Sequence, residues 1–595
     1  MVVEALKRLE YRGYDSAGVA AIGPRGIYCR KKSGRIFELE KILDNNFESN
    51  VAIGHNRWAT HGQPTDKNAH PHHDCHKNIF LVHNGIIENH KELKNKLIKN
   101  GHRFYSDTDT ETVVHLIEDF LNKGNYSFEE AVRLTLKSII GTYALVVINK
   151  NNPDKIIVAR NSSPLLVGFS DKCKYVASDA SALLPHTRKV VYLNDGEFAV
   201  LTSEDFRIAT LDRKVVSREH EKIDWSQDSV QKDNFPHFML KEIFEEPDAV
   251  RNAIRGRIIV QDGLAKLGGL ELKEKDLRKI NRLIISACGT AYIAGLAGEY
   301  MLEENAGIPV EVEYASEFRY KKHILEPKTA LLAISQSGET ADTLGAVKEL
   351  KRKGMLTLGM VNVVGSSIAR EVDAGVYNHA GPETSVASTK AFVSQLSVLA
   401  LLTLFLGRQR NMSLSAGKKI AEDLVALPKK MEEVLKLNNQ IKKIARKYFK
   451  YNNFLFLGRK YNYPIALEGA LKLKEISYIH AEGYGAGEMK HGPIALVDKD
   501  MPTMVIVPSD SVCEKVLNNI QEIKARRGKV IAIASQGNKE IAKIVDDVIY
   551  IPRTLEMLTP ILSVMPLHLF AYHVGFMRGH DVDRPRNLAK SVTVE

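Results

Sequence analysis

Three charged residues, Glu468, Lys472 and Glu475, recur at a spacing that groups them on one side of a helix. At about 100° per residue they fall within an arc of roughly 60°. Apolar or aromatic residues border both edges of this arc: Leu467, Leu471, Tyr478, Leu473 and Ile476. Because a solvated helix carries its charges opposite its apolar face, we expect this strip to face an enclosed site. The alternative is a solvated helix with ordinary i,i+4 ion pairs.

A glycine-rich turn follows the strip and leads to Glu488, Lys490 and His491. A carboxylate, an ammonium group and an imidazole near one cleft suit general acid–base catalysis. The stretch therefore predicts proton transfer on a small polar substrate.

Hydroxyl-rich turns precede several helices of the same half. Ser335, Gln336, Ser337 and Thr340 follow the apolar run at 330–334, and the turn at 383–390 repeats this chemistry. Hydroxyls, an amide and backbone N–H groups at a helix N-terminus bind phosphate without a basic side chain. One such turn is usually only a cap. Two of them, with Thr290 after another strand, predict a sugar-phosphate pocket.

The last segment, residues 583–595, mixes apolar residues with a single lysine, Lys590. We expect it to pack into the site rather than to extend into solvent, as polar tails do. A desolvated lysine there can form a Schiff base with a ketose carbonyl.

Three polar, glycine-containing loops stand out near the front of the chain, at residues 11–18, 55–62 and 83–89. Arg57 beside Trp58 can clamp a carboxylate. Asn84 and Gly85 offer a side-chain amide and a backbone N–H to an oxyanion. Asp109 begins a helix and is either a site residue or an N-cap.

The segment 70–76, HPHHDCH, mimics a set of metal ligands. Its spacing matches no standard zinc pattern, and no second ligand pair follows at a characteristic distance. We interpret it as a polar surface loop and predict no metal site.

A chain of 595 residues is too long to fold around one hydrophobic core, so we expect several domains to position these residues. Residues 1–225 predict an α+β domain of stacked sheets with flanking helices, and 226–238 read as a linker. Residues 239–425 and 426–582 alternate strands and helices, which predicts two α/β subdomains with doubly wound parallel sheets. Their parallel order suggests a duplication of roughly 170 residues. Long helical stretches are expected at 239–254, 391–406 and 413–448.

Composition excludes several classes of protein. There is no uninterrupted apolar run of 18 residues and no signal-peptide pattern, so we expect a cytoplasmic protein without a membrane segment. The five cysteines are scattered, which favours reduced thiols. The net charge of +11 is spread along the chain, which suits anionic small molecules rather than nucleic acid.

Together, these segments closely resemble the glutamine–fructose-6-phosphate aminotransferase (isomerizing) family over nearly the whole chain. The family's motifs occur in order: YRGYDSAG, RWATHG, HNGIIEN, SQSGETADT, VASTKAF, LEGALKLKEISYIHAE, KHGP and PRNLAKSVTVE. The resemblance implies a glutaminase domain of the N-terminal-nucleophile fold and two sugar-isomerase subdomains. It also implies an internal channel for ammonia, a homodimer, and neither metal nor organic cofactor.

The resemblance assigns roles residue by residue. For glutamine, Arg57 and Asp109 hold the carboxylate and amino group, Asn84 and Gly85 form the oxyanion hole, and Trp58 lies in the channel loop. Fructose 6-phosphate is bound by Thr290, Ser335, Gln336, Ser337, Thr340, Val386 and Ser388. His491, from the neighbouring subunit, assists ring opening, and Lys590 forms the imine at C2. Glu475 moves the proton between C1 and C2, with Lys472 and Glu468 supporting it.

One departure concerns the front of the chain. The family's mature chain begins with a cysteine that supplies both the nucleophilic thiol and the α-amine base, whereas this sequence begins MVVEALKRLE. Neither Cys29 nor Cys75 can present a free terminal amine. Either the start is set too far downstream, which we favour because the glutamine-binding residues are intact, or glutaminase activity is lost.

Two other functions stay open. A sugar-phosphate isomerase or deaminase, or an aminotransferase that uses only ammonia, needs no glutaminase. A non-enzymatic sugar-phosphate-sensing module is the third reading, although the set Glu475, His491 and Lys590 argues against it.

Overall fold

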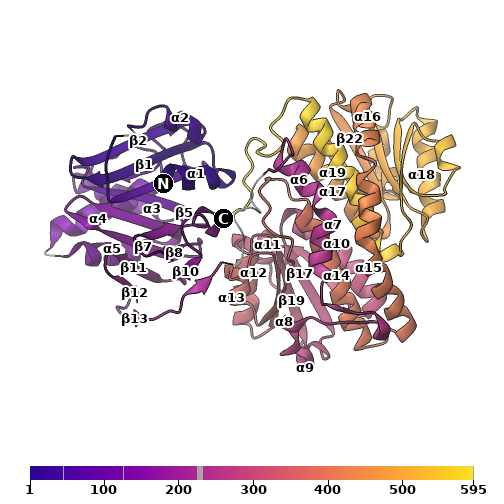
Figure 1. Cartoon of the computed structure of the whole chain (residues 1–595), viewed down its shortest axis with the longest axis horizontal. Helices are drawn as coiled ribbons and strands as arrows, with labels where there is room; N and C mark the ends of the chain where they lie inside the picture. The colour runs from indigo at the N-terminus through magenta and orange to yellow at the C-terminus, as the bar shows by residue number, and fades with distance from the viewer. Residues whose placement is uncertain (45, 125, 224–231, 594–595) are drawn as a thin grey trace. The chain divides into compact units, whose positions relative to one another are not determined.

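The computed structural model describes the chain except residues 45, 125, 224–231 and 594–595 (Figure 1). The chain forms two compact units. Unit 1 comprises Met1–Ser229 and Ser591–Glu595, and unit 2 comprises Val230–Lys590. Much of the predicted linker at 226–238 lies outside the described residues.

Unit 1 is built from antiparallel sheets. The largest has seven strands in the order β13-β12-β11-β7-β6-β5-β4, and the others have the orders β2-β1-β3 and β14-β10-β8-β9. The strands are β1 Ser16–Gly23, β2 Gly26–Ser33, β3 Val51–Arg57, β4 His72–His73, β5 Ile79–Ile87, β6 Gly141–Asn149, β7 Asn152–Asn161, β8 Leu166–Phe169, β9 Lys174–Ala177, β10 Lys189–Tyr192, β11 Glu197–Leu201, β12 Phe206–Thr210, β13 Val215–Val216 and β14 Glu221–Lys222.

The three-stranded sheet packs on one face of the seven-stranded sheet. Ala20, Ile22 and Ile53 of the smaller sheet form a core with Phe80 and Val82 of β5. The opposite face of the large sheet packs against helices, as the shared core of β5, β6, α4 and α5 shows. This arrangement confirms the predicted stacked sheets with flanking helices. The helices of unit 1 are α1 Val2–Arg8, α2 Ile36–Glu40, α3 His90–Lys99, α4 Thr110–Lys123 and α5 Phe128–Ser138.

Two polar motifs of unit 1 that the sequence predicted as loops begin on strands and leave them only after Arg57 and Ile87. β3 continues through Arg57 because Asn56 and Arg57 pair with β1. β5 continues to Ile87 because Asn84 and Gly85 pair with β6. Backbone pairing in an antiparallel sheet does not require apolar side chains, so the apolar runs alone underestimated the length of both strands.

Unit 2 contains two five-stranded parallel sheets with the same topology. Their orders are β18-β17-β19-β20-β21 and β23-β22-β24-β25-β26. This shared order confirms the duplication and the doubly wound class. The strands are β17 Arg282–Ala287, β18 Val310–Tyr314, β19 Thr329–Ser335, β20 Leu356–Val361, β21 Ala374–Tyr377, β22 Asn453–Gly458, β23 His480–Gly485, β24 Thr503–Val507, β25 Val530–Ser535 and β26 Asp547–Ile551.

Most of the main helices of unit 2 share one large apolar core with both sheets. Two of the expected long helices are each divided in two: α6 and α7 separate at Glu245, just before Pro247, and α15 and α16 separate at residues 436–437. The helices are α6 Phe238–Phe244, α7 Glu246–Ile254, α10 Gly289–Ala306, α12 Ala341–Arg352, α14 Lys390–Arg408, α15 Leu414–Leu435, α16 Asn438–Tyr448, α17 Tyr463–Ser477, α18 Cys513–Ala525 and α19 Thr559–Met577.

Two segments, Lys390–Arg408 and Glu556–Met577, are long and apolar enough to cross a membrane. A few polar residues interrupt them, so a search for an uninterrupted apolar run missed them. Their apolar windows are 100% buried within the protein. A core helix of a globular domain has this property, and these two helices form the centre of unit 2.

Candidate active sites

The predicted glutamine-binding residues of unit 1 surround one cavity of about 1100 Å³. Its lining includes all four of them, Arg57, Asn84, Gly85 and Asp109, and also Trp58, which was predicted to lie in the channel loop. They come from the end of β3, from β5 and from the start of α4. The fold therefore brings together groups that are up to 52 positions apart (109 − 57) in the sequence.

Arg57 is buried and holds the loop that follows β3. Its guanidinium donates hydrogen bonds to the carbonyl oxygens of His61, Gly62 (3.0 Å) and Gln63 (3.3 Å). Burial lowers the pKa of Arg57, and the nearby carboxylates of Asp15 and Asp109 oppose this shift. A planar cation fixed in this way is suited to bidentate recognition of a carboxylate.

Asn84 and Gly85 combine an amide with an unusual backbone conformation. Asn84 Oδ1 lies 2.9 Å from His55 Nε2, and burial lowers the pKa of His55 to about 4, so the ring is neutral. Gly85 has φ +133°, and a Cβ atom there would lie 2.0 Å from the Thr142 carbonyl oxygen. Only glycine fits this position. His55, which lines the same cavity, was not among the predicted site residues.

Asp109 occupies the N-cap position of α4 without capping it. Its side chain makes no capping hydrogen bond, and Oδ2 instead accepts the backbone N–H of Ile87 at 2.7 Å. The alternative that Asp109 is only a capping residue is therefore wrong. The carboxylate is buried beside the cavity, within the field of Arg57.

The segment HPHHDCH is not a polar surface loop. His70 and His72 are buried, and His72 belongs to β4. Cys75 lies at hydrogen-bonding distance from His102 and His115, which follow it by 27 and 40 positions. The sequence spacing could not reveal these partners because β5 and α3 intervene.

In unit 2, the strip on α17 is buried as predicted. The side chains of Glu468, Lys472 and Glu475 are 0%, 1% and 19% exposed. Lys472 Nζ lies 3.4 Å from Glu468 Oε1 and 2.6 Å from Glu475 Oε2. Burial raises the pKa of Glu468. Burial alone would lower the pKa of Lys472, but the carboxylates of Glu468 and Glu475 outweigh it and raise that pKa. The solvated ion-pair alternative is therefore wrong.

Replacing Lys472 with Met is expected to lower the free energy of unfolding by roughly 3–5 kcal/mol, because Glu468 loses its buried cation. Chemical denaturation monitored by circular dichroism measures this change. Lys474 lies on the same helix but is exposed, so Lys474→Met should change stability by less than about 0.5 kcal/mol. Equal losses in both variants would contradict the pairing.

Glu468 also joins the two halves of unit 2. Thr290, in the first turn of α10, donates a hydrogen bond from Oγ1 to Glu468 Oε1 at 3.2 Å. His568 Nε2, on α19, lies 3.9 Å from the same oxygen, and its Nδ1 lies 2.6 Å from Glu246 Oε1. The strip therefore belongs to a buried polar network that includes a predicted phosphate-site residue.

The hydroxyl-rich turn after β19 is folded on itself. Ser335 Oγ lies 2.9 Å from Thr340 Oγ1 and accepts the N–H of Gly338 at 3.0 Å. Ser337 Oγ accepts the N–H of Glu339, and the carbonyl of Gln336 accepts the N–H of Asn362. The turn precedes α12, whose N-cap residue is Thr340.

Lys590 is buried against the second hydroxyl-rich turn. Its Nζ forms an ion pair with Glu383, whose Oε1 accepts the N–H groups of Thr389 (2.9 Å) and Ala391 (3.0 Å). Burial opposes ionisation of Glu383, but Lys590 outweighs it and lowers the pKa of Glu383 to about 2. Burial and the Glu383 charge raise the pKa of neighbouring Glu242 to about 8.

Backbone contacts fix the segment before Lys590. The Asp583 carbonyl accepts the N–H of Val386 at 3.0 Å, and its carboxylate accepts two N–H groups at the start of α6. Val386 is buried and Ser388 is half-buried in the same turn. The tail thus lies beside the turn that was predicted to bind phosphate.

His491 is not joined to this network. It lies exposed in the short helix Glu488–His491, and among the described residues no hydrogen bond or ion pair links it to the α17 strip. The single chain therefore forms two groups of predicted site residues. One consists of Thr290, Glu468, Lys472 and Glu475, and the other of Lys590 and the turn at 383–390.

Four polar residues of this network were missed in the sequence: Glu242, Glu246, Glu383 and His568. For Glu242, Glu246 and His568 the signal was a charged or imidazole side chain within a helical stretch, whereas Glu383 lies in the hydroxyl-rich turn at 383–390. His568 in the helix around TPILSVMPLHLF is the clearest case.

In comparisons with known proteins, the two units match different family models. A glutamine amidotransferase domain model matches residues 55–185, and a SIS domain model matches residues 276–405 and 447–578. The C-terminal domain of glucosamine-fructose-6-phosphate aminotransferase from Francisella tularensis is 40% identical, with a TM-score of 0.57, over 60% of this chain and 100% of that chain.

Full-length relatives match from end to end. The glutamine–fructose-6-phosphate aminotransferase (isomerizing) of Chlorobaculum tepidum is 50% identical, over 100% of this chain and 98% of that protein. The protein of the same name from Bacteroides thetaiotaomicron is 48% identical with the same coverage. The chain therefore belongs to the glutamine–fructose-6-phosphate aminotransferase (isomerizing) family.

Proposed function

We propose that this protein is an enzyme that converts fructose 6-phosphate and glutamine into glucosamine 6-phosphate and glutamate. The observation that carries the proposal is the buried strip Glu468, Lys472 and Glu475, in contact with Thr290 of a hydroxyl-rich turn. A buried carboxylate beside a fixed ammonium group suits proton transfer on a sugar. The family membership supplies the two substrates.

In unit 1, the cavity residues hold glutamine. Arg57 binds its carboxylate, Asp109 its ammonium group, and Asn84 with the Gly85 N–H stabilises the oxyanion that forms at the amide carbon. Trp58 lies in the loop that Arg57 holds, and we assign it to the path of ammonia. Net attack of water on the amide carbon leaves glutamate and releases ammonia, and this ammonia is the nitrogen donor for the sugar site.

Replacing Asp109 with Asn is expected to weaken glutamine binding about 10- to 100-fold, since one charge-assisted hydrogen bond is lost. Asn keeps an oxygen that can accept the Ile87 N–H, so the fold is retained. Isothermal titration calorimetry with the full chain measures the affinity. Asp107→Asn, at an exposed residue two positions earlier, is the matched control. Equal affinities for wild type and Asp109→Asn would overturn the assignment.

In unit 2, Thr290, Ser335, Gln336, Ser337, Thr340, Val386 and Ser388 form the fructose 6-phosphate site. The hydroxyls and backbone N–H groups of these turns bind the phosphate. His491 of the neighbouring subunit in a homodimer assists ring opening, which agrees with its exposed position.

The sugar chemistry then uses two residues. Once Lys590 Nζ has lost a proton, it attacks the open-chain C2 carbonyl and water leaves, which gives an imine; ammonia then displaces the lysine amine and leaves a C2 imine on the sugar. Glu475 removes a proton from C1 and delivers it to C2, so that the ketose imine becomes an amino-aldose. Lys472 and Glu468 keep Glu475 in place. No metal or organic cofactor takes part in these steps.

The proposed boundaries are a glutaminase domain at 1–225, a linker at 226–238, sugar-isomerase subdomains at 239–425 and 426–582, and a tail at 583–595, whose part within unit 2, up to Lys590, enters the sugar site. We place the enzyme in the cytoplasm.

The test is a side-by-side assay of fructose 6-phosphate with glutamine and with ammonia. Glucosamine 6-phosphate from both nitrogen sources supports the proposal, whereas product from ammonia alone indicates an aminotransferase without glutaminase activity. Glucose 6-phosphate without nitrogen incorporation indicates an isomerase. Binding without any turnover indicates a sensing module.

A further inference from the structure

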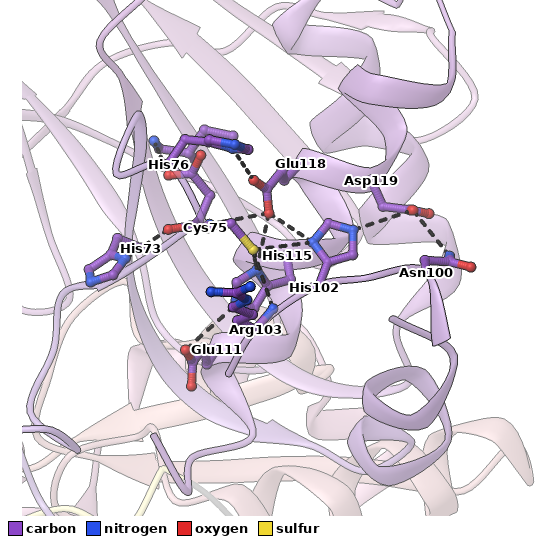
Figure 2. A network of polar contacts seen from close by, with 12 residues as sticks. His73, Cys75, His76, Asn100, His102, Arg103, Glu111, His115, Glu118 and Asp119 are labelled. Atoms are coloured by element: carbon purple, nitrogen blue, oxygen red, sulfur yellow. Dashed lines mark hydrogen bonds and ion pairs between the residues drawn. The ribbon is translucent and has the colours of Figure 1, made fainter. Parts of the chain in front are cut away.

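A second cluster of chemically active side chains lies in unit 1, outside the proposed glutamine site. Cys75, His102, His115 and Glu118 offer one ligand atom each, and these four atoms all lie within 4.8 Å of one another. Figure 2 shows the four side chains converging on one point, from the segment after β4, the loop after α3, and α4.

The distances between these atoms are those of a small coordination sphere. Cys75 Sγ lies 3.8 Å from His102 Nδ1 and 3.6 Å from His115 Nδ1. Glu118 Oε2 lies 2.8 Å and 3.1 Å from the same two nitrogens. In a tetrahedral zinc site, bond lengths of about 2.0–2.3 Å place sulfur about 3.6 Å from nitrogen, and nitrogen about 3.4 Å from oxygen. The two sulfur–nitrogen edges lie within 0.2 Å of the expected value, and the two nitrogen–oxygen edges are 0.3 and 0.6 Å shorter than expected.

The outer atoms of the ligands are also arranged as in metal sites. Both histidines direct Nδ1 inward, while His102 Nε2 lies 3.4 Å from Asp119 Oδ1 and His115 Nε2 lies 3.5 Å from Glu111 Oε1. A carboxylate behind each histidine is the usual second shell of a bound metal. Glu118 Oε1 lies 2.9 Å from His76 Nδ1, which fixes the carboxylate.

The cluster is closed to solvent on most sides. The side chains of His102, His115 and Glu118 are 7%, 0% and 5% exposed. The Cys75 sulfur accepts the N–H of Arg103 at 3.4 Å. A set of four protein ligands, a half-buried thiol with two imidazoles and a carboxylate that are buried, matches a structural rather than a catalytic zinc site.

We propose that Cys75, His102, His115 and Glu118 bind one structural Zn²⁺ ion. The ion joins the segment after β4 and the loop after α3 to α4. Because Asp109 lies at the N-terminus of α4, an ion that fixes α4 also fixes the position of this residue of the proposed glutamine site. The competing account is a metal-free hydrogen-bond network, in which Glu118 Oε2 accepts from both histidines and from the Cys75 N–H.

The decisive measurement is the zinc content of the full-length protein, purified without a metal-affinity tag and analysed by inductively coupled plasma mass spectrometry. About one zinc per chain is expected for four protein ligands. Cys75→Ser and His102→Ala should each lower zinc content at least about tenfold. Cys173→Ser, at an exposed cysteine, should leave it unchanged.

A second readout does not depend on the variants folding. Wild-type protein is stripped with a chelator and refilled with Co²⁺ alone. A thiolate-to-cobalt charge-transfer band and the visible bands of tetrahedral cobalt are expected. Wild-type protein that contains no zinc and gives no such bands would overturn the proposal in favour of the hydrogen-bond network. Neither readout requires sugar or glutamine turnover, so the result is independent of the proposed function.

Discussion

Replacing Lys590 with Arg is expected to lower glucosamine 6-phosphate formation by about 10³-fold, because a guanidinium group does not form the imine with the ketose. Arginine keeps the positive charge opposite Glu383, so this buried carboxylate retains a cation. Leaving Glu383 unpaired would cost roughly 3–5 kcal/mol and confuse the interpretation. Steady-state rates with ammonia and fructose 6-phosphate measure the effect directly.

Two controls separate chemistry from structure in this variant. Lys539→Arg, at an exposed lysine of unit 2, should leave the rate unchanged. The thermal midpoint of Lys590→Arg should lie close to that of wild type. A Lys590→Arg enzyme with wild-type turnover would rule out a covalent role for this lysine.

Replacing Glu475 with Gln is expected to reduce kcat by about 10²- to 10⁴-fold, the range for loss of a general base. Glutamine has nearly the shape of glutamate and can still accept a hydrogen bond from Lys472, which lies 2.6 Å from Glu475. The affinity for fructose 6-phosphate should change little, because the phosphate turns are untouched. Stopped-assay measurement of kcat and KM distinguishes these effects.

The Glu475→Gln variant should still form the imine at Lys590, since this step precedes proton transfer. Glu482→Gln, at a partly exposed carboxylate of β23, is the matched control and should retain full activity. If Glu475→Gln raised KM without lowering kcat, Glu475 would be a binding residue and not the base.

The sequence predicted the strip on α17 well because helical geometry is local. Three charges within one arc and apolar neighbours on both edges require only the period of the helix. The duplicated parallel sheets were predictable for a similar reason, since each apolar strand is followed by a polar turn. Both features depend on residues that are close in the chain.

The network around the strip could not be predicted in this way. Glu246, His568 and Glu468 come from α7, α19 and α17, which meet only through the shared core. In the sequence, His568 is one polar residue in an apolar helix, and its partner lies 322 positions away.

The cluster at Cys75 illustrates the same limit in unit 1. The segment HPHHDCH drew attention to seven neighbouring positions, 70–76, but only Cys75 belongs to the proposed zinc site. Its partners His102, His115 and Glu118 are placed by the turn after α3 and by the face of α4. His115 and Glu118, three positions apart on a helix, were the available signal.

Reduction of wild-type enzyme with borohydride in the presence of fructose 6-phosphate tests the central claim most directly. Borohydride converts an imine into a stable secondary amine, so peptide mass spectrometry can locate the sugar. The account predicts one reduced fructose 6-phosphate adduct, on the peptide that contains Lys590. The absence of an adduct, or an adduct on Lys472, would contradict it.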